Sequence, residues 1–154
     1  MLNLRHTGIY VKDLVRMSAF YRDVFQMHTI CENVEQSDEL IADLFQVKEA
    51  KVRITKLITE QGKASGVGDM LELLQLLEPE GKALAEDGPI SEGMHVAFGV
   101  RAIEMVVDAI AARGGKRMTR IHLMGNGNKC CFCCDPEGNW LELIEVQERK
   151  GQDG

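Results

Sequence analysis

Two histidines and two glutamates recur at matching places in this sequence of 154 residues. His6 and His95 each open a mostly apolar run, and Glu72 and Glu142 each stand inside a Leu-Glu-Leu segment further along. A buried imidazole or carboxylate without a partner is costly, so polar residues repeated within apolar runs need a common explanation. A divalent metal ion held by two imidazoles and two carboxylates would supply it. The residues therefore predict a metal site formed by His6, Glu72, His95 and Glu142.

Each of these residues also has a simpler interpretation. A single histidine is more often a surface residue or a hydrogen-bonded core residue than a metal ligand. Glu72 could face solvent while its two leucine neighbours face the core, and the same alternation applies to Glu142. Near Glu142, however, Glu145 is the more natural solvent-facing residue. The recurrence of both residue types in equivalent places favours the metal site.

The remaining histidines and the cysteines give no comparable pattern. His28 and His122 have no repeated counterpart, so we interpret them as structural or surface residues. Four of the five cysteines lie in segment 130–134 (CCFCC), and the fifth is Cys31. Adjacent side chains of a strand point to opposite faces, so these four cannot converge on one ion. We interpret them as small strand residues with free thiols, which fits a reducing compartment.

The composition excludes several classes of function. The net charge is −6 and no basic stripe is visible, which argues against a nucleic-acid partner. Lys12 and Asp13 interrupt the early apolar residues, so we expect neither a signal peptide nor a membrane span. We therefore expect a cytoplasmic protein. The length and the 45% hydrophobic content fit one compact domain.

The first half of the chain predicts the element order β-α-β-β-β. Strands are expected at residues 4–11, 27–34, 50–59 and 69–77. Asp13 is expected to cap a helix that ends near Gln26 and carries an apolar stripe. A short helical turn is expected after Ser37, and the Gly-Ser segment 62–68 is expected to be a loop.

The second half predicts the same order. Strands are expected at residues 94–100, 116–122, 128–134 and 139–147, with a helix over 102–113 that Gly114 and Gly115 end. We expect a first module over 1–78, a connector over 79–92, a second module over 93–147 and a polar tail over 148–154. All of them would form one compact domain.

The two modules place His and Glu in equivalent positions, which indicates an internal duplication. Glu72 follows His6 by 66 positions, and Glu142 follows His95 by 47. The longer spacing is taken up by an excursion at 35–49 and by segment 62–68. The fold class is therefore predicted to be α+β, built from paired βαβββ modules. The first and last strands of each module should meet their counterparts across a pseudo-twofold axis.

The chain resembles the vicinal oxygen chelate superfamily, the group of glyoxalases, bleomycin-resistance proteins and methylmalonyl-CoA epimerases. The resemblance spans about residues 4–146. It rests on His6 opening a strand and on segments 20–25 (FYRDVF) and 135–143 (DPEGNWLEL). It implies mixed sheets that curl into a cup around a divalent metal ion. The implied ligands are again His6, Glu72, His95 and Glu142, and Zn, Ni, Co, Mn and Fe are not distinguished.

The resemblance implies a metal-dependent lyase or isomerase of the glyoxalase type. The ion would bind a small substrate by two neighbouring oxygens and stabilise the enolate that forms when a proton leaves the adjacent carbon. Glu142 would be both a ligand and the catalytic base. A glutathione hemithioacetal or an acyl-CoA thioester is the expected substrate class. Segment 125–128 is first a tight turn, with a substrate lid as the alternative.

Other functions stay open. An enzyme similar to methylmalonyl-CoA epimerase would use the same enolate with a second base that the sequence does not identify. An extradiol dioxygenase or a fosfomycin-resistance thiol transferase would use three ligands, and a non-enzymatic antibiotic-binding protein would lack the four. We also expect a homodimer, because small curled sheets leave edges that need covering.

Overall fold

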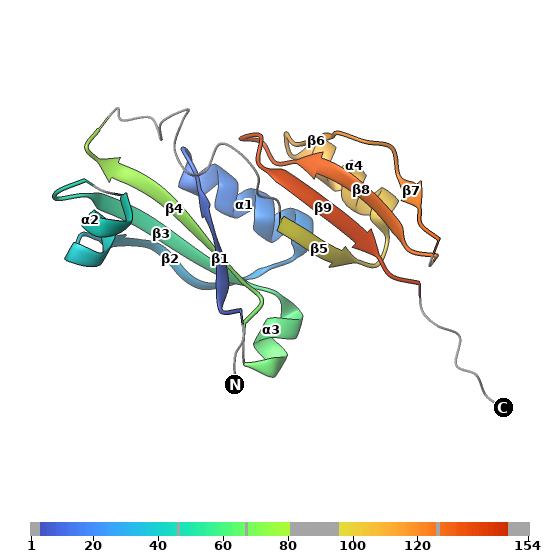
Figure 1. Cartoon of the computed structure of the whole chain (residues 1–154), viewed down its shortest axis with the longest axis horizontal. Coiled ribbons are helices and arrows are strands. Elements are labelled where there is room, and N and C mark those ends of the chain that lie inside the picture. Colours follow the sequence, from blue (N-terminus) through green and yellow to red (C-terminus); the bar gives the residue numbers. More distant parts are fainter. Residues whose placement is uncertain (1–3, 46, 67, 81–95, 126, 148–154) are drawn as a thin grey trace. The chain divides into compact units, whose positions relative to one another are not determined.

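The polypeptide contacts divide the chain into two compact units, residues 1–93 and 94–154. The computed structural model describes residues 4–45, 47–66, 68–80, 96–125 and 127–147 (Figure 1). Most of the predicted connector and the polar tail lie outside the described residues. The predicted approach of the two modules across a pseudo-twofold axis stays a prediction, as do the module boundaries and the single domain.

The first unit contains a four-stranded mixed sheet and three helices. Its elements are β1 (His6–Tyr10), α1 (Leu14–Phe25), β2 (His28–Gln36), α2 (Glu39–Phe45), β3 (Lys51–Ile58), α3 (Glu60–Ser65) and β4 (Met70–Glu78). The strand order is β1-β4-β3-β2. The first and last strands, β1 and β4, pair in parallel, and the other neighbours are antiparallel. The four strands and the long helix that the sequence predicts are confirmed.

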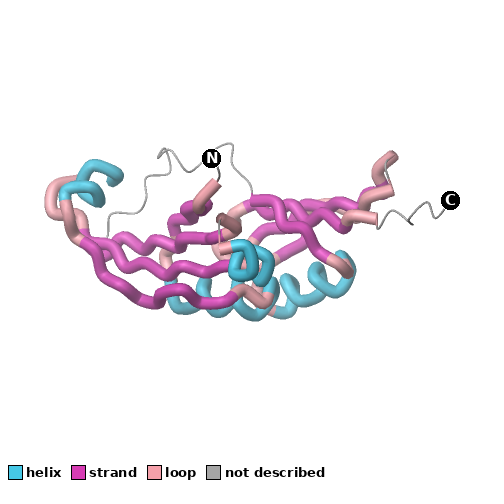
Figure 2. The backbone as a smooth tube through the Cα atoms, turned by 90° about the horizontal axis from the view of Figure 1, so that it is seen from below, coloured by secondary structure: helices cyan, strands magenta, loops and turns pink. Residues whose placement is uncertain are grey.

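Helix α1 covers one face of this sheet. The Asp13 side chain accepts a hydrogen bond from the Arg16 amide at 3.0 Å, which is the predicted N-terminal cap. The helix ends at Gln26, whose φ of 52° is left-handed. Leu14, Met17 and other apolar side chains of α1 are fully buried. Figure 2 shows helices lying along one face of the strands, and burial of the apolar stripe holds α1 on that face.

Helix α2 covers one end of the opposite face. Ile41 of α2 joins a buried cluster with Val52, Ile54 and Leu74 of the sheet. The ring of Tyr10 packs edge-on against Phe45, with centroids 5.4 Å apart. The buried cluster therefore covers this face at the end of β1 that carries Tyr10. His6, at the other end of β1, lies outside the cluster.

The prediction of a plain loop over 62–68 is wrong in its first part. Residues Glu60–Ser65 form helix α3, whose Thr59 cap accepts a hydrogen bond from the Gly62 amide at 3.0 Å. Gly62 is buried, and a Cβ atom there would lie 2.7 Å from the Cβ of Asp69. The close approach explains why a residue with low helix propensity stands inside the helix.

The second unit repeats the plan with shorter elements. They are β5 (Val96–Val100), α4 (Ile103–Ala112), β6 (Lys116–Arg117), β7 (His122–Leu123), β8 (Lys129–Cys134) and β9 (Trp140–Glu145). The sheet order is β5-β9-β8-β6, with β7 also paired to β8. Strands β5 and β9 are parallel, as are β1 and β4 in the first unit. The fold class, α+β with two mixed sheets, is confirmed.

The predicted strand over 116–122 is instead two short strands. The amides of Met118 and Thr119 both donate to the carbonyl of Phe132, at 2.8 and 3.2 Å. Two residues therefore face one partner, which interrupts the ladder as a β-bulge does. Pairing resumes only at His122, opposite Cys130.

Candidate metal-binding site

The first unit brings His6 and Glu72 together on one face of its sheet. In the parallel pairing of β1 with β4, His6 lies opposite Met70, and Gly8 lies opposite Glu72. Side chains two positions apart on a strand share a face, so His6 and Glu72 are diagonal neighbours. Nε2 of His6 is 4.0 Å from Oε2 of Glu72. The side chain of Glu72 is only 14% exposed, whereas that of His6 is 44% exposed.

The second unit places Glu142 at the equivalent position. Ala97 of β5 lies opposite Glu142 of β9, and Ala97 follows His95 by two residues, just as Gly8 follows His6. The side chain of Glu142 is partly buried. His95 itself lies outside the described residues. Strands β1 and β4 are therefore paired in the same register as β5 and β9: Gly8 lies opposite Glu72 in the first unit, and Ala97 lies opposite Glu142 in the second.

A hydrogen bond between the start of the long helix and a strand side chain also occurs in both units. The amide of Leu14 donates to Oε1 of Gln75 at 3.2 Å, and the amide of Ile103 donates to Oε2 of Glu145 at 2.7 Å. Gln75 and Glu145 each follow the candidate glutamate by three residues. This contact fixes each helix to the strand that carries the glutamate.

The interpretation of Glu145 as a solvent-facing residue is therefore wrong. Its side chain is 19% exposed and caps α4, because Ala102 provides no side-chain cap. A carboxylate at a helix N-terminus also interacts favourably with the helix dipole.

Sequence reasoning missed a lysine beside Glu72. Lys56 of β3 lies opposite Glu72 of β4, and its Nζ is 3.0 Å from Oε2 of Glu72. Residues two positions apart on a strand share a face, so Lys56 lies in one row between Ile54 and Ile58. A lysine within this apolar row is the feature of the sequence that could have pointed to Lys56. In the second unit Phe132 occupies the corresponding position, opposite Glu142.

Tyr10 lies on the same face, one row beyond Glu72. Burial raises the pKa of the Tyr10 phenol, and the negative charge of Glu72 raises it further. Tyr10 is therefore a neutral hydrogen-bonding group at ordinary pH.

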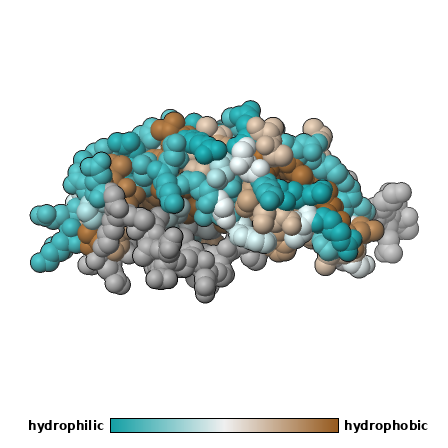
Figure 3. Space-filling model, turned by 90° about the horizontal axis from the view of Figure 1, so that it is seen from above, coloured by the Kyte–Doolittle hydropathy of each residue, from teal (hydrophilic) through white to brown (hydrophobic). Residues whose placement is uncertain are grey.

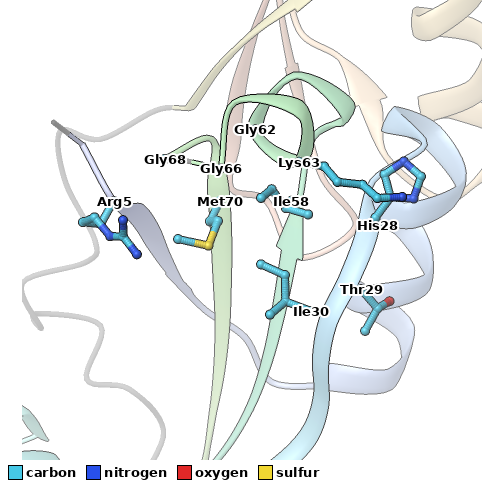
Figure 4. Close-up of a pocket in the computed structure, with 10 residues that line it drawn as sticks. All are labelled: Arg5, His28, Thr29, Ile30, Ile58, Gly62, Lys63, Gly66, Gly68 and Met70. Carbon is cyan, nitrogen blue, oxygen red and sulfur yellow. The ribbon is translucent and has the colours of Figure 1, made fainter.

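A pocket of about 530 Å³ opens next to these residues in the first unit (Figure 4). Its apolar floor includes Met70, Ile58 and Ile30, and Arg5 and Lys63 stand at its sides. Met70 precedes Glu72 by two positions on the same face of β4. His28 also lines the pocket and pairs with Glu60, and its side chain is 42% exposed, which agrees with its interpretation as a structural or surface residue.

The donor chemistry of the first unit fits one half of a divalent metal site. An imidazole and a carboxylate on one face, a few ångströms apart, are donors that divalent transition metals accept. The described residues hold no group of three or more His, Cys, Asp or Glu side chains placed to bind an ion, and His95 is not among them. The convergence of all four predicted ligands stays a prediction.

The cysteines alternate along β8 as expected. Cys131 and Cys133 are buried, whereas Cys130 and Cys134 are partly exposed, and all five cysteines are free. Burial raises the pKa of the Cys131 thiol, and it raises that of Cys133 to about 12. The two buried thiols therefore stay protonated.

The fold is α+β, with two βαβββ-type units that each carry a candidate glutamate on the last strand. The family model described as Glyoxalase/Bleomycin resistance protein/Dioxygenase superfamily matches residues 3–143. The chain belongs to this superfamily, as the sequence resemblance predicted. No curated protein sequence matches it significantly.

Solved structures of the same superfamily are similar in fold. A glyoxalase family protein from Bacillus cereus is 19% identical, with a TM-score of 0.78 over 94% of each chain. A glyoxalase I mutant from Zea mays is 18% identical, with a TM-score of 0.59 over 92% of this chain and 45% of that one. The fosfomycin resistance protein FosX from Listeria monocytogenes, in complex with Mn(II) and sulfate, is 17% identical. Its TM-score is 0.57, over 96% of this chain and 94% of that one.

No helix in the described part of the chain is long and apolar enough to cross a membrane.

Proposed function

We propose that the protein is a metal-dependent lyase or isomerase of the glyoxalase type. The observation that carries the proposal is the duplicated register, which gives Glu72 and Glu142 equivalent places relative to His6 and His95. Two equivalent His–Glu pairs would together supply four donors to one shared ion. The Mn(II) in the structure of the FosX relative supports a divalent ion in this fold.

A divalent ion held by His6, Glu72, His95 and Glu142 would supply the Lewis acid that stabilises an enolate. Glu142 is the base of the proposed reaction. It takes the proton from the carbon next to the substrate oxygens and returns it to the neighbouring carbon. Its partial burial, opposite the ring of Phe132, limits the water that competes for this proton.

The pocket of the first unit supports an anionic substrate. Arg5 and Lys63 give its sides positive charge, and Met70, Ile58 and Ile30 give it an apolar floor. A glutathione hemithioacetal and an acyl-CoA thioester both combine negative groups with an apolar or thioether portion. A reaction with one base is favoured over an epimerase with two bases, because the carboxylate of Glu72 is already paired with the ammonium group of Lys56.

Substituting the proposed base tests the function. Glu142→Gln keeps an oxygen that can coordinate a metal, but its amide cannot accept a proton. Proton exchange at the substrate carbon should fall by a factor on the order of 10²–10⁴ while metal binding persists. The measurement is solvent deuterium incorporation with a panel of hemithioacetals and acyl-CoA thioesters, with metal content determined for each variant.

The control is Glu104→Gln, which changes an exposed carboxylate of α4 and should leave exchange unaltered. Undiminished exchange in metal-loaded Glu142→Gln would remove Glu142 from the role of base. Failure of the wild-type protein to bind any divalent ion would contradict the proposed function itself.

A further inference from the structure

We propose that Lys56 is a built-in cation of the metal site, whose ammonium group competes with a divalent ion for the carboxylate of Glu72. The site would therefore bind metal more weakly than its donor set allows. This inference rests on the proposed metal site and concerns its regulation by a residue outside the ligand set.

The geometry puts two groups next to one carboxylate oxygen of Glu72. Nζ of Lys56 lies 3.0 Å from Oε2 of Glu72, and Nε2 of His6 lies 4.0 Å from the same oxygen. A metal ion bound by Nε2 of His6 and Oε2 of Glu72 would lie close to the ammonium group, which contacts the same oxygen. Ammonium and metal are both positive, so each lowers the affinity of the carboxylate for the other.

Burial strengthens this competition. The side chain of Glu72 is 14% exposed, so solvent screens its charge less than that of a surface carboxylate. The side chain of Lys56 is 39% exposed, which leaves the ammonium a path into solvent when a metal ion binds. The lysine can thus yield its place without a change in the fold.

Other basic residues of β3 make ordinary surface pairs. Lys51 and Arg53 both contact Glu35 of β2, at 3.0 and 3.2 Å, and the side chain of Glu35 is 45% exposed. Lys51 therefore offers a matched control, since its N–O distance equals that of the Lys56 pair but its partner is not a candidate ligand.

The second unit shows that the fold does not require a lysine here. Phe132 lies opposite Glu142, in the place that Lys56 occupies opposite Glu72. The two candidate half-sites therefore differ in the residue opposite the glutamate, although their backbone registers agree.

Calorimetric titration of the metal-stripped full-length protein with Mn²⁺ and Zn²⁺ tests the competition. Lys56→Met keeps the length of the side chain and removes its charge, and affinity should rise about tenfold or more. Lys56→Gln is a second variant should the methionine perturb folding, and far-UV circular dichroism checks both. Lys51→Met should change the affinity less than about twofold, as expected for an exposed pair. His6→Ala in the Lys56→Met background should cancel the gain.

The outcomes separate this inference from the function on which it rests. Equal or weaker binding by folded Lys56→Met and Lys56→Gln, with metal binding by the wild type intact, overturns the role of Lys56 alone. Absence of binding in the wild type and in both variants overturns the metal site as well. A gain in affinity that His6→Ala leaves unaltered also overturns the inference, because the ion would then bind elsewhere.

Discussion

Glu72 and Glu142 illustrate how equivalent backbone positions acquire different chemistry from one neighbouring residue. Glu72 lies opposite a lysine, and Glu142 lies opposite a phenylalanine. The carboxylate of Glu72 pairs with the ammonium group of Lys56, whereas the residue opposite Glu142 carries an aromatic ring. The proposed reaction gives the proton-transfer role to Glu142 and treats Glu72 as a ligand only.

This difference predicts unequal effects of two matched substitutions. Glu72→Gln should lower solvent deuterium exchange less than Glu142→Gln does, since Glu72 is proposed as a ligand only. The amide oxygen can still coordinate, and the loss of negative charge should appear mainly as weaker metal binding. Exchange rates at saturating metal, measured beside the metal affinity of each variant, separate the two effects. Equal losses of exchange from both substitutions would instead favour an epimerase with two bases.

At this scale the sequence predicts residue types and their repetition, but not their neighbours across strands. Glu72 was found because His and Glu recur together. Lys56 was missed because its partner is 16 positions away on another strand, and only the β3–β4 register brings them together. Glu145 was misassigned for a similar reason, since its partner amide belongs to Ile103. Long-range pairing of this kind is set by tertiary structure.

At the scale of elements, the turn before β9 depends on one buried carboxylate. Asp135 is 2% exposed. It accepts hydrogen bonds from the amides of Glu137 and Asn139, both at 2.9 Å, and from the side-chain amide of Asn139 at 2.7 Å. These bonds fix the reversal between β8 and β9 and hence the place of Glu142.

Removal of this carboxylate should destabilise the second unit. Asp135→Ala leaves two backbone donors partly buried without their acceptor, so the free energy of unfolding should fall by about 3 kcal/mol. Asp108→Ala, on the exposed side of α4, should change it by less than about 0.5 kcal/mol. Urea denaturation followed by the fluorescence of Trp140, the single tryptophan, provides the measurement. Similar midpoints for both variants would contradict the structural role of Asp135.

Elements with strong local signals are those that the sequence predicts well. The stripe and cap of α1 and the alternation of β3 are local, and both elements are confirmed. Helix α3 was missed because glycine and serine favour loops, whereas its formation depends on the Thr59 cap and on the close packing of Gly62. The break between β6 and β7 depends on two amides that share the Phe132 carbonyl, which no local pattern reveals.

At the scale of the whole molecule, the sequence predicts the superfamily and the paired modules because duplication is visible along one chain. It does not fix the substrate, since specificity depends on side chains that line the pocket from separate elements. Arg5 comes before β1, and Lys63 comes from α3, the helix that sequence patterns missed. The positively charged residues at the sides of the pocket therefore became apparent only from the fold.

The exposed edge of the first sheet supports the predicted homodimer. Strand β2 ends the strand order, and its Ile30 and Val34 side chains are 50% and 48% exposed. Figure 3 shows apolar side chains among hydrophilic ones on the face drawn. An edge strand with apolar side chains is suited to pairing with a second copy.

Sedimentation velocity at micromolar concentration tests this assembly. The wild type should sediment as a dimer, and Val34→Lys should shift it toward the monomer because a charge would be buried at the edge. Val15→Lys introduces the same charge at an exposed position of α1 and should leave the dimer intact. A monomeric wild type would contradict the prediction.

The alternating thiols of β8 make this strand a natural reporter of when the second unit opens. At pH 8 a thiol with a pKa of about 12 is deprotonated only about one part in 10⁴ of the time, so Cys133 should scarcely react with a thiol reagent. Cys130 and Cys134, which are partly exposed, should react promptly. Slow labelling of Cys131 and Cys133 then measures the opening of the second unit. Comparing its denaturant dependence with global unfolding would show whether that unit opens on its own or only together with the first.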